Sequence, residues 1–328
     1  MEYKSIKGIS GLGQIGLLFA LLALGLVSAG AVQYLFSLQI ANAGVSLQNS
    51  EALQKAMLLP QNVGLARASQ VVSTCMLLFV PAVLYSLISH GKNWIWLGFS
   101  RHFTMVQIAI GFALILLASM AAVPVADFSK YIISFFPSVN SLAKSMETAY
   151  MAQALALSNL HSMSEYVVAL FIMAFFPALF EEVFFRGALQ TILEKWWQKP
   201  LIAIMVTSLI FSLIHSSIYL FLSRALLGFV LGYMFYLTKN IWVNIIAHFI
   251  NNAIVLTALY VNKIKTGKVS LDTADPSVHW AVGLCSTIVL IGCFILLHKF
   301  SKNTKQQILL KQNLLYNQAN QPNPLADL

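Results

Sequence analysis

Long apolar runs separated by short polar connections follow one another along most of the 328-residue chain. A helix needs about 20 predominantly apolar residues to cross a hydrocarbon core that is about 30 Å thick. Runs of that length predict eight membrane-spanning helices. The predicted spans are 15–38, 69–89, 104–123, 165–185, 201–219, 221–237, 241–260 and 280–298. We therefore expect an all-α fold, a polytopic membrane helix bundle.

The connections and the ends of the chain add detail to this picture. The first apolar run is longer than the h-region of a signal peptide, about 7–15 residues, and lacks a small-residue cleavage site, so we expect it to remain as a span. Two connections are long, 39–68 and 124–163. Within the second, segment 141–160 has apolar residues at near-helical spacing, which predicts a helix in the interface or across the bundle. The tail after Ser301 is rich in Gln and Asn, and we expect it to be partly disordered.

The composition agrees with a membrane protein. Hydrophobic residues make up 59% of the chain and charged residues only 9%, against about 25% charged in a typical globular protein. This excludes an ordinary soluble enzyme. The net charge of +9 comes from residues spread over short loops and the tail, so we expect no nucleic-acid partner. The cysteines show neither disulfide nor zinc-site spacing; they are Cys75, Cys285 and Cys293.

Lysines and arginines in the connections predict the orientation. Cytoplasmic loops of membrane proteins carry an excess of these residues. With the N-terminus inside, the cytoplasmic side holds twelve of the 20 basic residues. This modest bias predicts that both termini are cytoplasmic and that the chain lies in the cell membrane as a multi-pass protein.

The fourth span carries an unusual group of charges, Glu181, Glu182 and Arg186. One such residue at the centre of a membrane helix costs about 2.5–3.5 kcal/mol on insertion scales. Glu182 and Arg186 are four residues apart on one helix face and can neutralise each other. Glu181 points about 100° away and has no local partner. A buried ion pair between helices explains Glu182 and Arg186 well but leaves Glu181 unexplained.

His215, at the end of the fifth predicted span, is expected to face Glu181. If the turn between spans four and five lies near Gln198, Glu181 precedes it by 17 residues and His215 follows it by 17. At about 1.5 Å per residue, both then lie roughly 25 Å from the turn. A lone histidine on an apolar helix is more often a packing residue, but its registration with an unpaired glutamate favours a site.

The seventh span has a polar stripe of Asn244, His248 and Asn252, with Asn251 beside it. Hydrogen bonds that hold membrane helices together are the competing interpretation, above all for Asn244 and Asn251. His248 lies only nine residues, about 14 Å, after a turn near Lys239. It reaches the level of Glu181 only if the preceding hairpin projects further or the helices tilt.

The sixth span contains Gly228 and Gly232, which are four residues apart. Small residues at this spacing let a neighbouring membrane helix approach closely. The pair predicts a compact bundle.

Two chemistries fit a glutamate, two histidines and an asparagine that face one another in a low-dielectric bundle. In the first, Glu181, His215 and His248 bind a divalent metal such as zinc and leave one position for an activated water. In the second, Glu181 and His215 activate the water without a metal, while His248 and Asn252 donate to the developing oxyanion. Both hydrolyse an amide bond. Neither a His-Glu-x-x-His motif nor a Gly-x-Ser-x-Gly motif is present.

Three motifs together resemble the CAAX protease and bacteriocin-processing family (CPBP, or Abi) of intramembrane endopeptidases. They are Glu181-Glu182-Val183-Phe184-Phe185-Arg186, Phe211-Ser212-Leu213-Ile214-His215 and His248-Phe249-Ile250-Asn251-Asn252. The resemblance covers about residues 166–258. It implies catalytic roles for Glu181, His215, His248 and Asn252, with Glu182 and Arg186 in support. It also implies an eight-helix type of core and a cavity open to the cytoplasm.

On this basis we divide the chain into N-terminal helices, 1–160, a catalytic core, 161–262, and a last helix with a polar tail, 263–328. The expected substrate is a membrane-associated or lipidated protein or peptide, because members of the family cleave prenylated proteins or are linked to bacteriocin processing. Two other functions stay open. Buried Glu and His residues can relay protons in a transporter, and a non-catalytic bacteriocin-immunity protein can retain the motifs as a scaffold.

Overall fold

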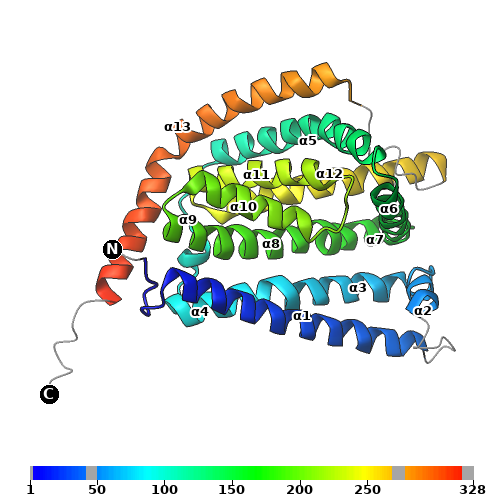
Figure 1. Cartoon of the computed structure of the whole chain (residues 1–328), viewed down its shortest axis with the longest axis horizontal. Coiled ribbons are helices and arrows are strands. Elements are labelled where there is room, and N and C mark those ends of the chain that lie inside the picture. Colours follow the sequence, from blue (N-terminus) through cyan, green and yellow to red (C-terminus); the bar gives the residue numbers. More distant parts are fainter. Residues whose placement is uncertain (1–2, 42–49, 268–277, 320–328) are drawn as a thin grey trace.

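Helices packed side by side in three layers make up the structure, a computed structural model that describes residues 3–41, 50–267 and 278–319. One outer layer holds α1, α3 and α4, and the other holds α5 and α13. A long helix, residues 163–197, lies between them with α10, α11 and α12 (Figure 1). The elements are α1 (Gly11–Ala41), α2 (Ser50–Met57), α3 (Val63–Thr74), η1 (Cys75–Phe79), α4 (Val80–His90), η2 (Trp94–Leu97), α5 (Met105–Ser134), α6 (Pro137–Leu157), α7 (Met163–Ala169), η3 (Leu170–Phe175), α8 (Phe176–Glu182), η4 (Val183–Gln190), α9 (Thr191–Trp197), α10 (Pro200–Leu213), α11 (Phe221–Thr238), α12 (Ile241–Thr266) and α13 (Trp280–Ala319).

Seven helices in the described part of the chain are long and apolar enough to cross a membrane. They are Gly11–Ile40, Val63–His90, Met105–Ser134, Met163–Trp197, Phe221–Thr238, Ile241–Thr266 and Trp280–Ala319. Each contains one of the predicted spans or coincides with most of it. The all-α polytopic fold predicted from the sequence is therefore confirmed.

The fifth predicted span, 201–219, differs from the structure. Its helix, α10, ends at Leu213 after 14 residues, which corresponds to only about 21 Å. Ser216 has a positive φ of 48°, and the chain turns back there toward α11. The hydropathy window extended beyond the helix because the turn itself is apolar, with Ile218 and Tyr219 in it. The early end of α10 leaves His215 at a helix terminus inside the bundle.

The long helix 163–197 combines α7, η3, α8, η4 and α9, and two of these elements are π-helical. The first π stretch, η3, comes just before Pro177, which has no N–H and whose ring clashes with the preceding turn. A widened turn relieves that clash, and π stretches inside α-helices occur often at functional sites. The second stretch, η4, follows Glu182 and contains Arg186.

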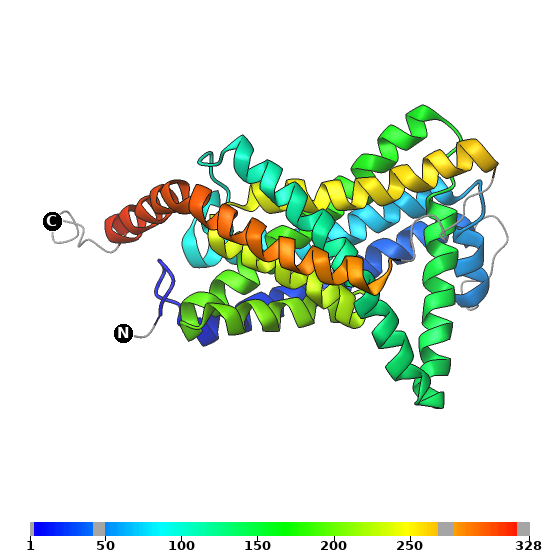
Figure 2. The ribbon, with the colours of Figure 1, turned by 90° about the horizontal axis from the view of Figure 1, so that it is seen from above.

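The helix predicted within 141–160 is present as α6, Pro137–Leu157. It is seen end-on in Figure 1 and runs across the other helices in Figure 2, so it caps one end of the bundle. Helix α5 continues to Ser134 and joins it directly. The other long connection, 39–68, contains α2, but residues 42–49 lie outside the described part of the chain.

The polar tail is more ordered than its composition suggested. Helix α13 continues to residue 319, so the prediction of disorder after Ser301 is wrong for residues 302–319. Ile308 is fully buried in a cluster with Ile95 and Trp96, and Leu315 packs against the same cluster. Ile308 and Leu315 are seven residues apart and share one helix face. The remainder of the predicted tail, 320–328, lies outside the described residues.

Candidate active site

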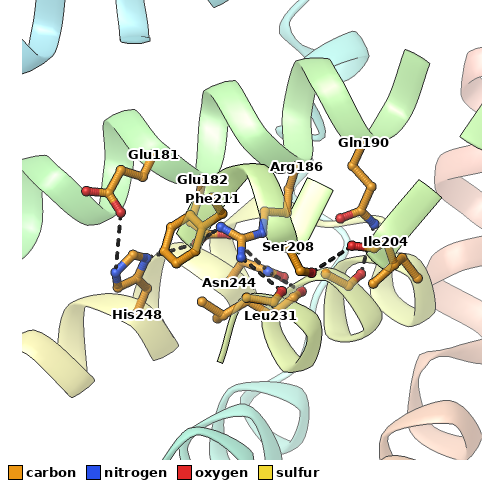
Figure 3. Close-up of polar contacts among 12 residues, drawn as sticks. Glu181, Glu182, Arg186, Gln190, Ile204, Ser208, Phe211, Leu231, Asn244 and His248 are labelled. Atoms are coloured by element: carbon orange, nitrogen blue, oxygen red, sulfur yellow. Dashed lines mark hydrogen bonds and ion pairs between the residues drawn. The ribbon is translucent and has the colours of Figure 1, made fainter. Parts of the chain in front are cut away.

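Glu182 and Arg186 form a buried ion pair, as their spacing predicted. Glu182 Oε1 lies 2.7 Å from Arg186 Nη1, and the two side chains are 0% and 1% exposed. The second carboxylate oxygen accepts a hydrogen bond of 3.2 Å from Asn244 Nδ2. The guanidinium also donates to the carbonyl of Gly228 at 3.1 Å and lies 4.7 Å from the ring centroid of Phe211. Both charges are therefore compensated inside the bundle (Figure 3).

A second polar contact repeats this arrangement one turn further along the helix. Gln190 Nε2 donates to the carbonyl of Gly232 at 2.9 Å, just as Arg186 donates to Gly228. A Cβ added at Gly232 would lie 2.9 Å from Gln190 Oε1 and 2.9 Å from a side-chain carbon of Ile204. The glycine pair thus allows the close approach that its spacing predicted, and its carbonyls accept hydrogen bonds from the neighbouring helix.

Glu181 lies on a different face and reaches two histidines. Its Oε2 atom is 3.8 Å from Nε2 of His215 and 3.8 Å from Nε2 of His248. This buried oxygen has no hydrogen-bond partner among the described residues. The predicted registration of Glu181 with His215 is present, and His248 reaches the same point.

Each histidine is oriented by a hydrogen bond from its other ring nitrogen. His248 Nδ1 lies 2.9 Å from Glu182 Oε1, and His215 Nδ1 lies 2.7 Å from the carbonyl of Phe211. A carboxylate and a carbonyl oxygen can only accept, so Nδ1 donates in both rings. In a neutral imidazole the Nε2 lone pair is then directed at Glu181. Glu181 Oε2 and the two Nε2 atoms are therefore three hydrogen-bond acceptors that converge on one point. Such a point attracts a hydrogen-bond donor or a cation.

The two asparagines that follow His248 in sequence have different surroundings. Asn251 Oδ1 accepts a hydrogen bond of 2.8 Å from Ser119 Oγ on α5, which links two helices. Asn252 lines the same cavity as His215 and His248. Asn244 is fully buried and donates to the carbonyl of Leu231 at 2.7 Å in addition to Glu182. Asn244 and Asn251 therefore link helices through their hydrogen bonds, and Asn251 lines the cavity together with Asn252.

A cavity of about 440 Å³ extends from the histidines toward α6. Its walls include three residues that the sequence did not single out: Tyr150 and Gln153 of α6, and Arg224 of α11. Only Arg224 had a visible signal, a charge four residues into an apolar span. The cavity thus has one basic side chain close to the glutamate and the histidines.

The cavity lies toward the end of the bundle that α6 caps. The start of α1 and the end of α13 lie at one end of the bundle, whereas α6 lies at the other (Figures 1 and 2). The cavity extends toward α6.

The residues are suitable for a metal in type, and nearly so in geometry. No set of three His, Cys, Asp or Glu side chains in the described ranges already has the arrangement of metal ligands. Glu181 Oε2 is 3.8 Å from each Nε2 atom, while ligands of tetrahedral zinc lie about 3.3 Å apart at bond lengths of about 2.0–2.1 Å. Glu181 is therefore about 0.5 Å too far from each histidine for this arrangement.

A family model matches the middle of the chain. Residues 163–254 match the model of the family described as type II CAAX prenyl endopeptidase Rce1-like. The resemblance that the three motifs predicted is confirmed for this segment. Neither the curated proteins nor the solved structures yield a match to the chain. The matched segment contains every predicted catalytic residue, from Glu181 to Asn252.

Proposed function

We propose that this chain, whose central helices match a family of CAAX prenyl endopeptidases, is an intramembrane endopeptidase that hydrolyses a peptide bond of a membrane-associated or lipidated substrate. The observation that carries the proposal is the convergence of Glu181 Oε2 with the Nε2 atoms of His215 and His248, two residues that line a cavity. Peptide hydrolysis needs a water molecule, a base to take its proton and donors for the oxyanion. This site offers groups for each requirement.

In the proposed mechanism, Glu181 and His215 bind the attacking water. Glu181 takes a proton as the water oxygen bonds to the carbonyl carbon, and that proton then passes to the leaving amine as the C–N bond breaks. Asn252 and a protonated His248 donate to the oxyanion between these two steps. The Glu182 carboxylate stabilises the positive charge of His248 through the 2.9 Å contact with Nδ1. The tetrahedral intermediate therefore forms among groups that are already oriented.

If the enzyme uses a divalent metal, the same three side chains, Glu181, His215 and His248, would hold it. A bound zinc ion lowers the pKa of its water and polarises the carbonyl. The roles of Glu182 and Phe211 do not change, because they hold the Nδ1 side of each ring and leave Nε2 directed into the site.

The proposal is tested with a fluorogenic peptide carrying a prenylated cysteine, and with comparative proteomics of membranes that contain wild type or Glu181→Gln. We expect wild type to cut the peptide, or to generate new termini among membrane proteins, and both Glu181→Gln and His215→Ala to lose this activity. Asn251→Ala is the matched control, since its side chain bonds to Ser119 and not to the glutamate. Full cleavage by folded Glu181→Gln protein rules the proposal out.

The metal question has its own measurement. Stoichiometric zinc in wild-type protein that is lost in His248→Ala, together with inhibition by chelators, supports the metal-dependent form. Full activity of metal-stripped protein supports the metal-free form. Proton flux in liposomes that stops with Glu181→Gln, without peptide cleavage, identifies a transporter instead, and immunity that survives this substitution identifies a non-catalytic protein.

A further inference from the structure

Arg224 is a charged residue of the cavity that the proposed mechanism does not use. It lies in the first turns of α11 and lines the same cavity as His215 and His248. It precedes Lys239, at the end of α11, by 15 residues, which is a rise of about 22 Å. The hydrocarbon core is about 30 Å thick. Arg224 therefore lies in the first turn of its span, at the level of His215, whose carbonyl it contacts.

The partners of Arg224 leave its charge uncompensated. Its Nη1 donates to the main-chain carbonyl of His215 at 3.0 Å, and its guanidinium carbon lies 5.1 Å from the ring centroid of Tyr150. Both partners are neutral. No carboxylate of the described residues forms an ion pair with it, in contrast to Arg186 with Glu182 and Arg67 with Glu165. A charged residue inside a membrane span without a counter-ion indicates a functional role.

The hydrogen-bonding capacity of the guanidinium is also largely unused. Arginine has five N–H donors, and two of them on one edge match the two oxygens of a carboxylate. Among the described residues only Nη1 of Arg224 has an acceptor, the carbonyl of His215. The opposite edge, Nη2 with Nε, remains open to a bidentate ligand. The half-buried side chain is therefore accessible and positioned to bind an anion.

We infer that Arg224 binds a carboxylate of the peptide substrate and so determines which bond is cut. This inference rests on the proposed endopeptidase function. Because Arg224 bonds to the backbone of His215 itself, the bound carboxylate lies within about three residues of the scissile bond, at about 3.3 Å per extended residue. The carboxylate can belong to the C-terminus of the substrate or to an Asp or Glu side chain. Arg224 is a specificity residue in either case.

The test compares two enzymes on three substrates. A peptide that wild type cuts is prepared with a free C-terminus, with a C-terminal amide, and with each acidic side chain near the cleavage site changed to its amide. We expect loss of the recognised carboxylate to lower kcat/KM of wild type by about 10–100-fold, the range for a hydrogen bond to a charged group. The substrate that shows the loss identifies the source of the carboxylate.

Arg224→Gln should cut the unmodified peptide as slowly as wild type cuts the modified one, and amidation should then have no further effect. A merely structural role for Arg224 predicts the same loss on all substrates, and that result overturns the inference. Arg224→Lys keeps the charge and should retain part of the preference. It serves as the second enzyme if Arg224→Gln fails to fold. Asn251→Ala, another side chain at this cavity, should keep the full wild-type preference.

The failures of the two proposals are distinguishable. If wild type cuts no peptide, the endopeptidase proposal fails. If wild type cuts the C-terminal amide and every side-chain amide as fast as the unmodified peptide, the endopeptidase stands and the role of Arg224 is wrong.

Discussion

Two faces of the helix 163–197 carry polar residues, and they differ in the partners of their glutamates. On the packed face, Glu182, Arg186 and Gln190 contact partners on α11 and α12. On the cavity face, Glu181 has a carboxylate oxygen with no hydrogen bond from the described residues. A membrane interior penalises unpaired polar groups heavily. The two adjacent glutamates thus differ in their surroundings: Glu182 pairs with Arg186 and Asn244, whereas Glu181 Oε2 meets the two histidines at 3.8 Å.

The largest expected effect is on the cavity face. Glu181→Gln keeps the shape of the side chain but removes the proposed base, so we expect cleavage to fall by about 10²–10⁴-fold. The free energy of unfolding should not fall, because no hydrogen bond to the missing charge is lost. Peptide cleavage and thermal unfolding in detergent measure the two quantities. A large loss of stability with a small loss of activity would place Glu181 on the packed face instead.

On the packed face, we expect substitutions to lower the free energy of unfolding. Arg186→Met leaves Glu182 as a buried charge without its partner, and breaking such a pair costs about 3–5 kcal/mol. The double variant Glu182→Leu/Arg186→Met removes both charges and should recover most of this stability. Reversible unfolding in mixed detergents measures the difference. If the single and double variants are equally unstable, packing around the ion pair matters more than the charge.

The sequence could predict the relative level of two site residues where one turn connects their helices, but not where the turns of two hairpins had to be compared. The contact of Glu181 with His215 followed from counting residues around one turn, since the rise of a helix is fixed. The level of His248 did not follow. The depth of His248 was counted from the turn near Lys239. Lys239 pairs with Glu194, which precedes Gln198 by four residues, so the hairpin at Trp197 extends past that turn.

Other features depended on contacts between distant segments. The helix α6 could be predicted from the near-helical spacing of its apolar residues, but its place across the bundle could not, because Leu142 and Tyr150 of that spacing remain exposed. The end of α10 could not, because the turn after it is as apolar as the helix. The order of residues 302–319 comes from Ile308 against Trp96, more than 200 positions apart. The composition of the tail contains no trace of that contact.

A smaller effect is expected where α11 approaches the packed face. Gly232→Ala places a methyl group 2.9 Å from Gln190 Oε1 and from Ile204, so one of these must move. Overpacking of this kind costs about 1–3 kcal/mol. Gly292→Ala is the matched control, as its added Cβ has no neighbour within 4 Å, and it should be neutral or slightly stabilising. Equal unfolding midpoints for the two variants would show that Gln190 can move away without cost.

The smallest effect is expected at Asn251, which tests the same distinction on α12. Its hydrogen bond with Ser119 joins α12 to α5, and such bonds between membrane helices average about 0.6 kcal/mol. Asn251→Ala should therefore lower stability slightly and leave cleavage unchanged, even though Asn251 lies next to the proposed oxyanion donor Asn252. Ser119→Ala removes the same bond from the other side and should give a similar loss, with no addition in the double variant. A substantial loss of cleavage in Asn251→Ala alone would extend the catalytic face to both asparagines, because one hydrogen bond between helices cannot account for it.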